Sequence, residues 1–208
     1  MLGFWYVFKY VKHLRATGRR WSFYVMRKKV SFFIGFSLVL VMSSCSATKF
    51  LLNYASGDDR KPGKMKDWVY TTERNSYRVA PLSQNWKKVP VEGGDIAFYN
   101  SADDIIFTVS SVCTDRDYDL KTLSDSLVVG VGKKRMKLRK DIEVGGGGGL
   151  YTEYDVSLDD ENLSLATVVH KSSKCDYDFS YSTDPAGFQA NLGKFIDFLS
   201  GFEELWAK

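Results

Sequence analysis

The chain has 208 residues, of which 44% are hydrophobic and 26% are charged, and its formal net charge is +4 at pH 7. This composition is typical of a folded protein rather than of a disordered tail. The positive charge lies at the start, because residues 1–45 hold eight Lys or Arg and no Asp or Glu. The other 163 residues carry 21 basic and 25 acidic side chains. Domains that bind nucleic acids are usually basic, so this balance argues against nucleic acid as a partner.

Residues 26–46, MRKKVSFFIGFSLVLVMSSCS, have the layout of a secretory signal peptide: basic residues, an apolar run and then small residues. The apolar run covers 13 residues, whereas a membrane-spanning helix needs about 20. We therefore assign residues 26–44 to a signal peptide. Residues 1–25 are interpreted as an over-extended gene start, with a genuine cytoplasmic extension as the alternative.

The end of this segment, VMSSC at residues 41–45, resembles the lipobox of bacterial lipoproteins, although Met42 stands where that family usually has Leu. The resemblance implies that Cys45 is acylated, becomes the first residue of the mature protein and holds it on a membrane. An ordinary signal peptide with a chance cysteine is the alternative. Ser46 resembles the signal for sorting to the outer membrane. Residues 45–67, rich in charge and turn-forming residues, are expected to be the anchor and tether.

Residues 68–208 are expected to form one globular domain. Its first half predicts short strands at 77–79, 94–100 and 104–112, the last two joined as a hairpin. Apolar residues then recur at helical spacing over 120–131, with Asp119 as N-cap and Gly132 as a stop.

The second half alternates again, which predicts strands at 134–144, 150–158, 162–171 and 175–182. A closing helix should start with Asp184 as N-cap and Pro185 in its first turn, and it carries one apolar stripe. Mostly hairpin connections and two helices indicate the α+β class, an antiparallel sheet of about six to seven strands with helices packed on it.

Several features resemble the PsbP family: Tyr77-Arg78-Val79-Ala80-Pro81 with Trp86, the order of the elements, and a closing helix that ends in Ser200-Gly201-Phe202. The resemblance covers about residues 77–202. It implies an α/β/α sandwich and a small accessory protein that binds other proteins. No metal-binding or catalytic position is carried over from that family.

Besides Cys45, the chain has two cysteines, Cys113 and Cys175. Outside the cytoplasm an isolated pair favours a disulfide, and two buried thiols are the alternative.

A basic run stands out in the strand at 134–144. Strand alternation places Arg135, Lys137 and Arg139 on one face, with Met136 and Leu138 on the other. The sequence favours a solvated face neutralised by the next strand, with Arg139 opposite Asp155 and Arg135 opposite Asp159 if the turn centres near Gly147. The alternative is a docking face for lipid phosphates or an acidic partner.

Other chemical signals are weak. The glycines at 145–149 lie between two strands and lack the Lys-Ser/Thr of a phosphate loop, so they predict a hairpin. His170 has no neighbouring ligands or nucleophile and reads as a strand residue. The alternating acids Asp115, Asp117 and Asp119 lack the spacing of a calcium loop and read as a capped, solvated loop.

Three functions remain open: a non-enzymatic accessory lipoprotein that binds an envelope protein, a binder of lipid or a small ligand, and an enzyme. The first is favoured because of the expected lipid anchor, the short tether, the resemblance to the PsbP family and the lack of a catalytic constellation. The basic face at Arg135, Lys137 and Arg139 and the aromatic-rich core speak for the second.

Overall fold

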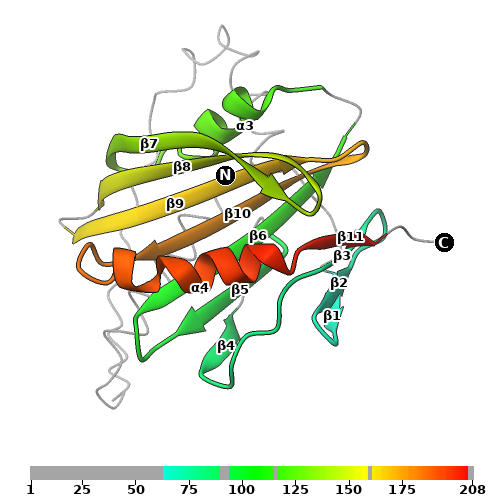
Figure 1. The fold of residues 1–208 in the computed structure, drawn as a ribbon, viewed down its shortest axis with the longest axis horizontal. Helices are drawn as coiled ribbons and strands as arrows, with labels where there is room; N and C mark the ends of the chain where they lie inside the picture. The colour runs from blue at the N-terminus through cyan, green and yellow to red at the C-terminus, as the bar shows by residue number, and fades with distance from the viewer. Residues whose placement is uncertain (1–62, 90–93, 115–116, 159–160, 206–208) are drawn as a thin grey trace, which may run out of the picture.

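The computed structural model describes residues 63–89, 94–114, 117–158 and 161–205, which form two antiparallel sheets and two helices (Figure 1). The expected α+β class is confirmed. The elements run β1 (Lys64–Lys66), β2 (Val69–Thr71), β3 (Ser76–Arg78), β4 (Trp86–Val89), β5 (Ile96–Asn100), β6 (Ile105–Cys113), α3 (Leu120–Leu127), β7 (Lys133–Val144), β8 (Gly147–Leu158), β9 (Glu161–Lys171), β10 (Cys175–Thr183), α4 (Phe188–Ser200) and β11 (Glu203–Leu205).

The large sheet has seven strands in the order β4-β5-β6-β10-β9-β8-β7. Hairpins join β7 to β8, β8 to β9 and β9 to β10, and the last strand then pairs with β6. The strand β7 therefore lies at one edge of the sheet, and β4 lies at the other. Each of these two edge strands has one row of backbone N–H and C=O groups that no other strand of the described sheet pairs with.

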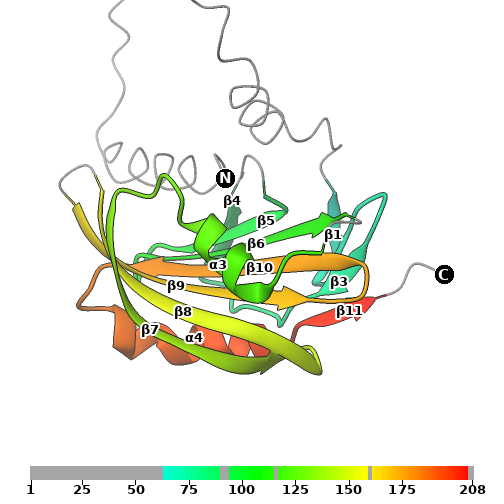
Figure 2. The ribbon, with the colours of Figure 1, turned by 90° about the horizontal axis from the view of Figure 1, so that it is seen from above.

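The two helices cover opposite faces of this sheet, as Figure 2 shows. Neighbouring residues of β9 demonstrate it: Leu165 packs with Val128 and Val131 after α3, whereas Ala166 packs with the aromatic core under α4. Successive side chains of a strand point to opposite faces, so one strand serves both layers. We call the two sides of the sheet the α3 face and the α4 face.

The helix boundaries differ in part from the sequence prediction. Asp119 caps α3 as expected, accepting a hydrogen bond from the Thr122 amide at 2.8 Å, but the helix ends at Leu127 instead of reaching Gly132. At the second helix, Asp184 accepts from the Gly187 amide at 2.7 Å. It thus holds a turn ahead of α4, and the helix begins three residues later than a cap at that position would place it. Among the described residues, no helix combines the length and apolar character needed to cross a bilayer.

A second, smaller sheet has the order β1-β2-β3-β11. The sequence predicted only its β3 strand, because three-residue strands are too short to show alternation. β1 lies inside the stretch interpreted as tether, so residues 64–66 belong to the folded domain. Tyr70 and Tyr77 of this sheet join the core under α4. Because the sheet combines β1, β2 and β3 from the start of the domain with β11 from its end, both ends of the domain pack on the same core.

Replacing a glycine with alanine should have opposite effects on stability at two positions near the end of the domain, Gly193 and Gly201. Gly193 is exposed inside α4 with nothing within 4 Å of an added Cβ, whereas a Cβ on Gly201 would lie 2.5 Å from the Cβ of Ala80. We expect Gly193→Ala to stabilise the domain by about 0.5–1 kcal/mol through helix propensity. Gly201→Ala should destabilise it by about 1–3 kcal/mol through overpacking. Thermal unfolding of both variants checks this, and equal shifts would contradict it.

Candidate functional site

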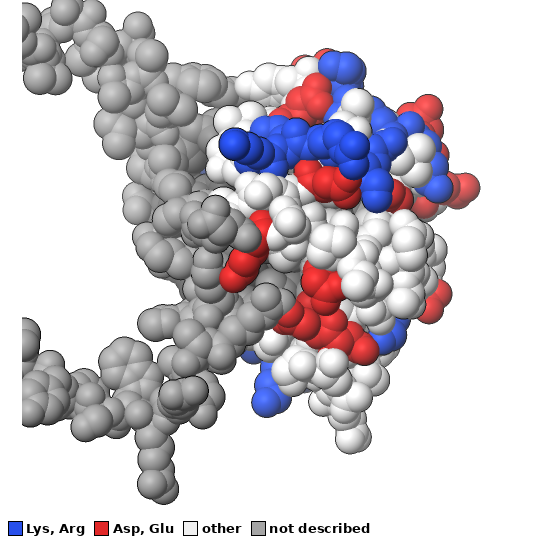
Figure 3. All heavy atoms as spheres, turned by 90° about the vertical axis from the view of Figure 1, so that its left-hand side faces the viewer, with Lys and Arg blue, Asp and Glu red and all other residues white. Residues whose placement is uncertain are grey.

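The edge strand β7 carries the highest density of positive charge in the described chain. Nine of its 12 residues are exposed. Lys and Arg side chains form a band on the upper part of the molecule in Figure 3, where Figure 1 places this strand. We call its six cations the basic edge: Lys133, Lys134, Arg135, Lys137, Arg139 and Lys140.

The hairpin register differs from the predicted one. Gly145 and Gly146 form the turn, with φ of 57° and 77°, which suits a two-residue hairpin turn. The next three glycines belong to β8. Gly147 and Gly149 lack side chains where Cβ atoms would lie 2.8 Å from the His170 ring and 3.0 Å from the Val169 carbonyl oxygen. The expected turn centre near Gly147 is therefore wrong.

Arg135 consequently lies opposite Asp155 rather than Asp159, and Arg139 lies opposite Thr152 rather than Asp155. The pairing also skips a residue between Met136 and Leu138, which leaves Lys137 as a bulge. A bulge breaks the two-residue alternation. The prediction that Arg139 shares a face with Arg135 and Lys137 is thus wrong.

The bulge gathers a different set of cations on the α4 face. Arg135 and Lys137 both reach the Asp155 carboxylate, at 2.7 and 3.5 Å. Lys140 lies on the same face, its ammonium 5.3 Å from the centre of the Tyr151 ring. We call this set the four-cation face: Lys133, Arg135, Lys137 and Lys140.

This face keeps an excess of positive charge. Among the described residues, Asp155 is the carboxylate that forms ion pairs with it. The hydrogen bond from Arg135, with the nearby charge of Lys137, lowers the pKa of Asp155 and keeps it ionised. Asp155 forms ion pairs with two of the four cations. Glu153 lies on the same face, but it is buried and accepts a hydrogen bond from the Tyr151 hydroxyl at 2.7 Å. The predicted neutralisation by the neighbouring strand is therefore incomplete.

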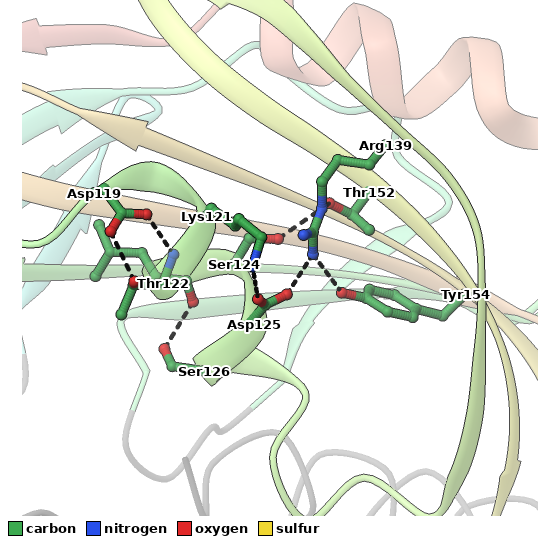
Figure 4. Close-up of polar contacts among 10 residues, drawn as sticks. Asp119, Lys121, Thr122, Ser124, Asp125, Ser126, Arg139, Thr152 and Tyr154 are labelled. Carbon is green, nitrogen blue, oxygen red and sulfur yellow. Dashed lines mark hydrogen bonds and ion pairs between the residues drawn. The ribbon is translucent and has the colours of Figure 1, made fainter.

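Arg139 crosses to the α3 face and has a structural role (Figure 4). Its guanidinium donates to the hydroxyls of Thr152 at 3.2 Å and Tyr154 at 3.3 Å, and to the Asp125 carboxylate of α3 at 2.5 Å. Lys121 reaches the same carboxylate at 3.1 Å. The hydrogen bond from Arg139 lowers the pKa of Asp125. Arg139 therefore fastens α3 to the edge hairpin.

We expect Arg139→Gln to destabilise the domain by about 1–3 kcal/mol, because the Arg139 side chain is only 19% exposed and its loss leaves several groups unpaired. Arg135→Gln is the control and should change stability by less than about 0.5 kcal/mol, since its side chain is 80% exposed.

The ion pair between Arg139 and Asp125 also predicts how stability depends on pH, because it lowers the pKa of Asp125. A carboxyl whose folded pKa is lowered stabilises the fold above its unfolded pKa, about 4, and loses that contribution as the pH falls through the folded pKa. Denaturant unfolding between pH 2 and 7 should therefore show a smaller loss on acidification in Arg139→Gln than in wild type. Equal losses would contradict the assignment.

The two cysteines lie directly opposite each other, Cys113 at the end of β6 and Cys175 at the start of β10. The structure joins them in a disulfide that closes a separation of 62 residues. This is the pairing that the sequence favoured, and its formation in cells stays a prediction.

The other residues considered for catalysis or metal binding make structural contacts instead. His170 is buried in the aromatic core, 5.6 Å from the Phe202 ring centre, and its Nδ1 is 3.0 Å from the Gly148 carbonyl oxygen. Asp119 caps α3, and Asp117 pairs with Lys171. Asp115 lies outside the described residues. Within the part of the chain that the structure describes, no group of three potential metal ligands occurs.

Sequence reasoning missed Lys133 and Lys140 as members of the face. Lys133 has the same parity as Arg135, so alternation was sufficient to find it. Lys140 has the wrong parity, and only the bulge at Lys137 brings it to this side. The lipidation candidate Cys45 lies outside the described residues, as do the signal segment and most of the tether.

Comparison with known protein families finds no match, and no curated protein sequence matches the chain. Solved structures do show similarity. One is LpqN of Mycobacterium tuberculosis, involved in cell envelope biogenesis, with 10% identity over 64% of this chain and 86% of that chain and a TM-score of 0.48. Another is the PsbP protein CyanoP of Synechocystis sp. PCC 6803, with 17% identity over 69% and 90% and a TM-score of 0.46. A third is PA94 of Pseudomonas aeruginosa, a protein of unknown function, with 14% identity over 67% and 96% and a TM-score of 0.43.

Proposed function

We propose that this chain is a non-enzymatic lipoprotein of the outer membrane, anchored through Cys45, whose domain binds an acidic protein partner in the cell envelope. The four-cation face is the binding surface. The lipid holds the domain near the membrane, and the tether lets the face meet its partner there.

The excess charge of the four-cation face is the observation that carries this proposal. Among the described residues, ion pairs join Asp155 to two of the four cations, Arg135 and Lys137, and leave Lys133 and Lys140 without an ion pair. Such a local field attracts acidic groups and speeds their association. The cations also follow one strand, which suits a partner that presents acids along a line.

The buried position of His170 supports a binding role over catalysis by that residue. A general base must reach the proton that it removes. His170 is 5% exposed and packs against Tyr177 and Phe202, so no substrate in solvent reaches its ring.

A peptide titration tests the docking surface. The probe is a peptide of about ten residues in which Glu alternates with Thr, and the control replaces each Glu with Gln. The purified full chain should bind the acidic probe, with an affinity that falls as salt rises. Equal binding of the Gln peptide would overturn the role of the cations. Binding only to vesicles of phosphatidylglycerol would move the function to a lipid surface.

The anchor gives a separate prediction. Purified wild-type protein should have the intact mass of a chain that begins at Cys45 and carries acyl groups on it, and it should partition into detergent. Cys45→Ser should remain in the aqueous phase. Two or more acyl chains attach a protein stably to a membrane, whereas a single acyl chain binds only marginally. A wild type with an unmodified cysteine would contradict the anchor.

A cleft beside α4 supports small-ligand binding as a second candidate function. It has a volume of about 270 Å³ and lies between α4, the β5–β6 turn and the segment before β4. Trp86 and Phe198 give it apolar surface, and Asp197 and a Lys194–Asp103 ion pair of 2.6 Å give it charge. This open, half-polar cleft differs from the enclosed apolar pocket expected of a lipid binder.

A further inference from the structure

Resting on the docking role above, we infer that the partner contributes an acidic, extended segment that pairs with β7 and extends the seven-stranded sheet by one strand. The binding mode is strand addition, in which backbone hydrogen bonds supply affinity and side chains supply specificity. The features that carry it are the length of this edge, its charge and its two exposed apolar residues.

The edge at β7 is unusually long and open. β7 has 12 residues and β4, at the opposite edge, has four. Natural edge strands are usually kept short or covered. Among the described residues, β7 pairs with β8 alone, so its outward-facing N–H and C=O groups have no strand partner. A strand added here would satisfy them.

Charge selects the occupant of this edge. Lysines on an edge, together with a bulge, normally discourage pairing with other strands. A second copy would set cations against cations, and like charges opposite each other destabilise a sheet. A strand that carries carboxylates would instead be attracted by the cations of β7. The partner is therefore an acidic segment rather than another copy of this chain.

The centre of β7 adds a preference for apolar residues. Met136 is 53% exposed and Leu138 is 41% exposed. They flank the bulge and lie on opposite faces, since Met136 is opposite Tyr154 and Leu138 is opposite Glu153. An added strand would cover both. The segment that fits best has one or two apolar residues in the middle and acids on both sides.

Backbone methylation of a peptide tests strand addition separately from charge attraction. The probe is the acidic peptide with two central Val residues, prepared unmodified and in two versions with N-methyl groups on alternate amides. Only alternate amides of a strand point at a neighbour. One methylated version should bind at least about tenfold more weakly, through the lost hydrogen bonds, while the other, of equal charge, binds as the unmodified peptide does.

Hydrogen exchange on the full chain gives the second readout. The unmodified peptide should slow amide exchange in residues 133–144 and leave the opposite edge at residues 86–89 unchanged. If both methylated versions bind as tightly as the unmodified one and exchange in β7 is unaltered, strand addition is overturned while docking by charge survives. If the unmodified acidic peptide does not bind, both strand addition and the proposed function fail.

Discussion

Replacing both Cys113 and Cys175 with Ala should lower the free energy of unfolding by about 4 kcal/mol and the melting temperature by about 8–16 °C. The bond closes a separation of 62 residues, and its loss enlarges the unfolded ensemble accordingly. It also joins β6 to β10, the pairing at the middle of the large sheet. Thermal unfolding followed by circular dichroism measures the change.

Reductant supplies the matched control for this prediction. It should destabilise the wild type and leave the double Ala variant unchanged, because the variant has no bond to break. Peptide mapping of the wild type without reductant should yield one cross-linked pair. Full alkylation of both thiols in protein taken from the periplasm would show that the bond does not form there.

Reversing the four-cation face, with Glu at positions 133, 135, 137 and 140, should weaken binding of the acidic peptide by about ten- to a thousand-fold. Each exposed charge pair contributes about 0.2–1 kcal/mol, and reversal replaces attraction with repulsion at four places. The loss should lie mainly in the association rate and should shrink at high salt. Stopped-flow or surface-based kinetics at two salt concentrations measures it.

A second variant separates local from global charge. Lys64, Lys66, Lys87 and Lys88 are exposed cations on β1 and β4, away from β7. Changing these four to Glu alters the net charge by the same amount. Binding of the peptide should then fall far less than in the face variant. An equal loss in both variants would show that net charge, rather than the four-cation face, attracts the peptide.

Long strands with regular alternation were predictable from sequence, and short or irregular pieces were not. The four strands from β7 to β10 lie within a few residues of their predicted limits, because each shows many alternating positions. β1, β2, β4 and β11 have three or four residues, too few to display a period. Their formation depends on partners that are distant in sequence, which no local pattern reports.

The basic edge shows how one residue changes a site. The sequence located the cations, but their distribution between faces depends on the bulge at Lys137 and on a turn at Gly145–Gly146. A shift of one residue moves every following side chain to the other face. For this reason Arg139 joins α3 and Lys140 replaces it on the α4 face.

For the glycine run and His170 the sequence predicted the kind of role but not the packing partners. The glycine run was expected to form a flexible hairpin, yet Gly147 and Gly149 serve the close approach of β8 to β9. His170 was expected to be a structural strand residue, and the aromatic contacts that bury it come from β10 and from Phe202 near the chain end. Packing partners from separate elements decide such roles.

Site-specific photo-cross-linking in cells tests the central claim, that the domain binds a protein through the edge at β7. A benzophenone amino acid at Leu138 reports on this edge, and one at Lys88 reports on the opposite edge. We predict a protein adduct from position 138 that is absent from position 88 and is lost when the four-cation face is reversed. Adducts of equal strength from both positions, or an adduct that persists after the reversal, would contradict the claim.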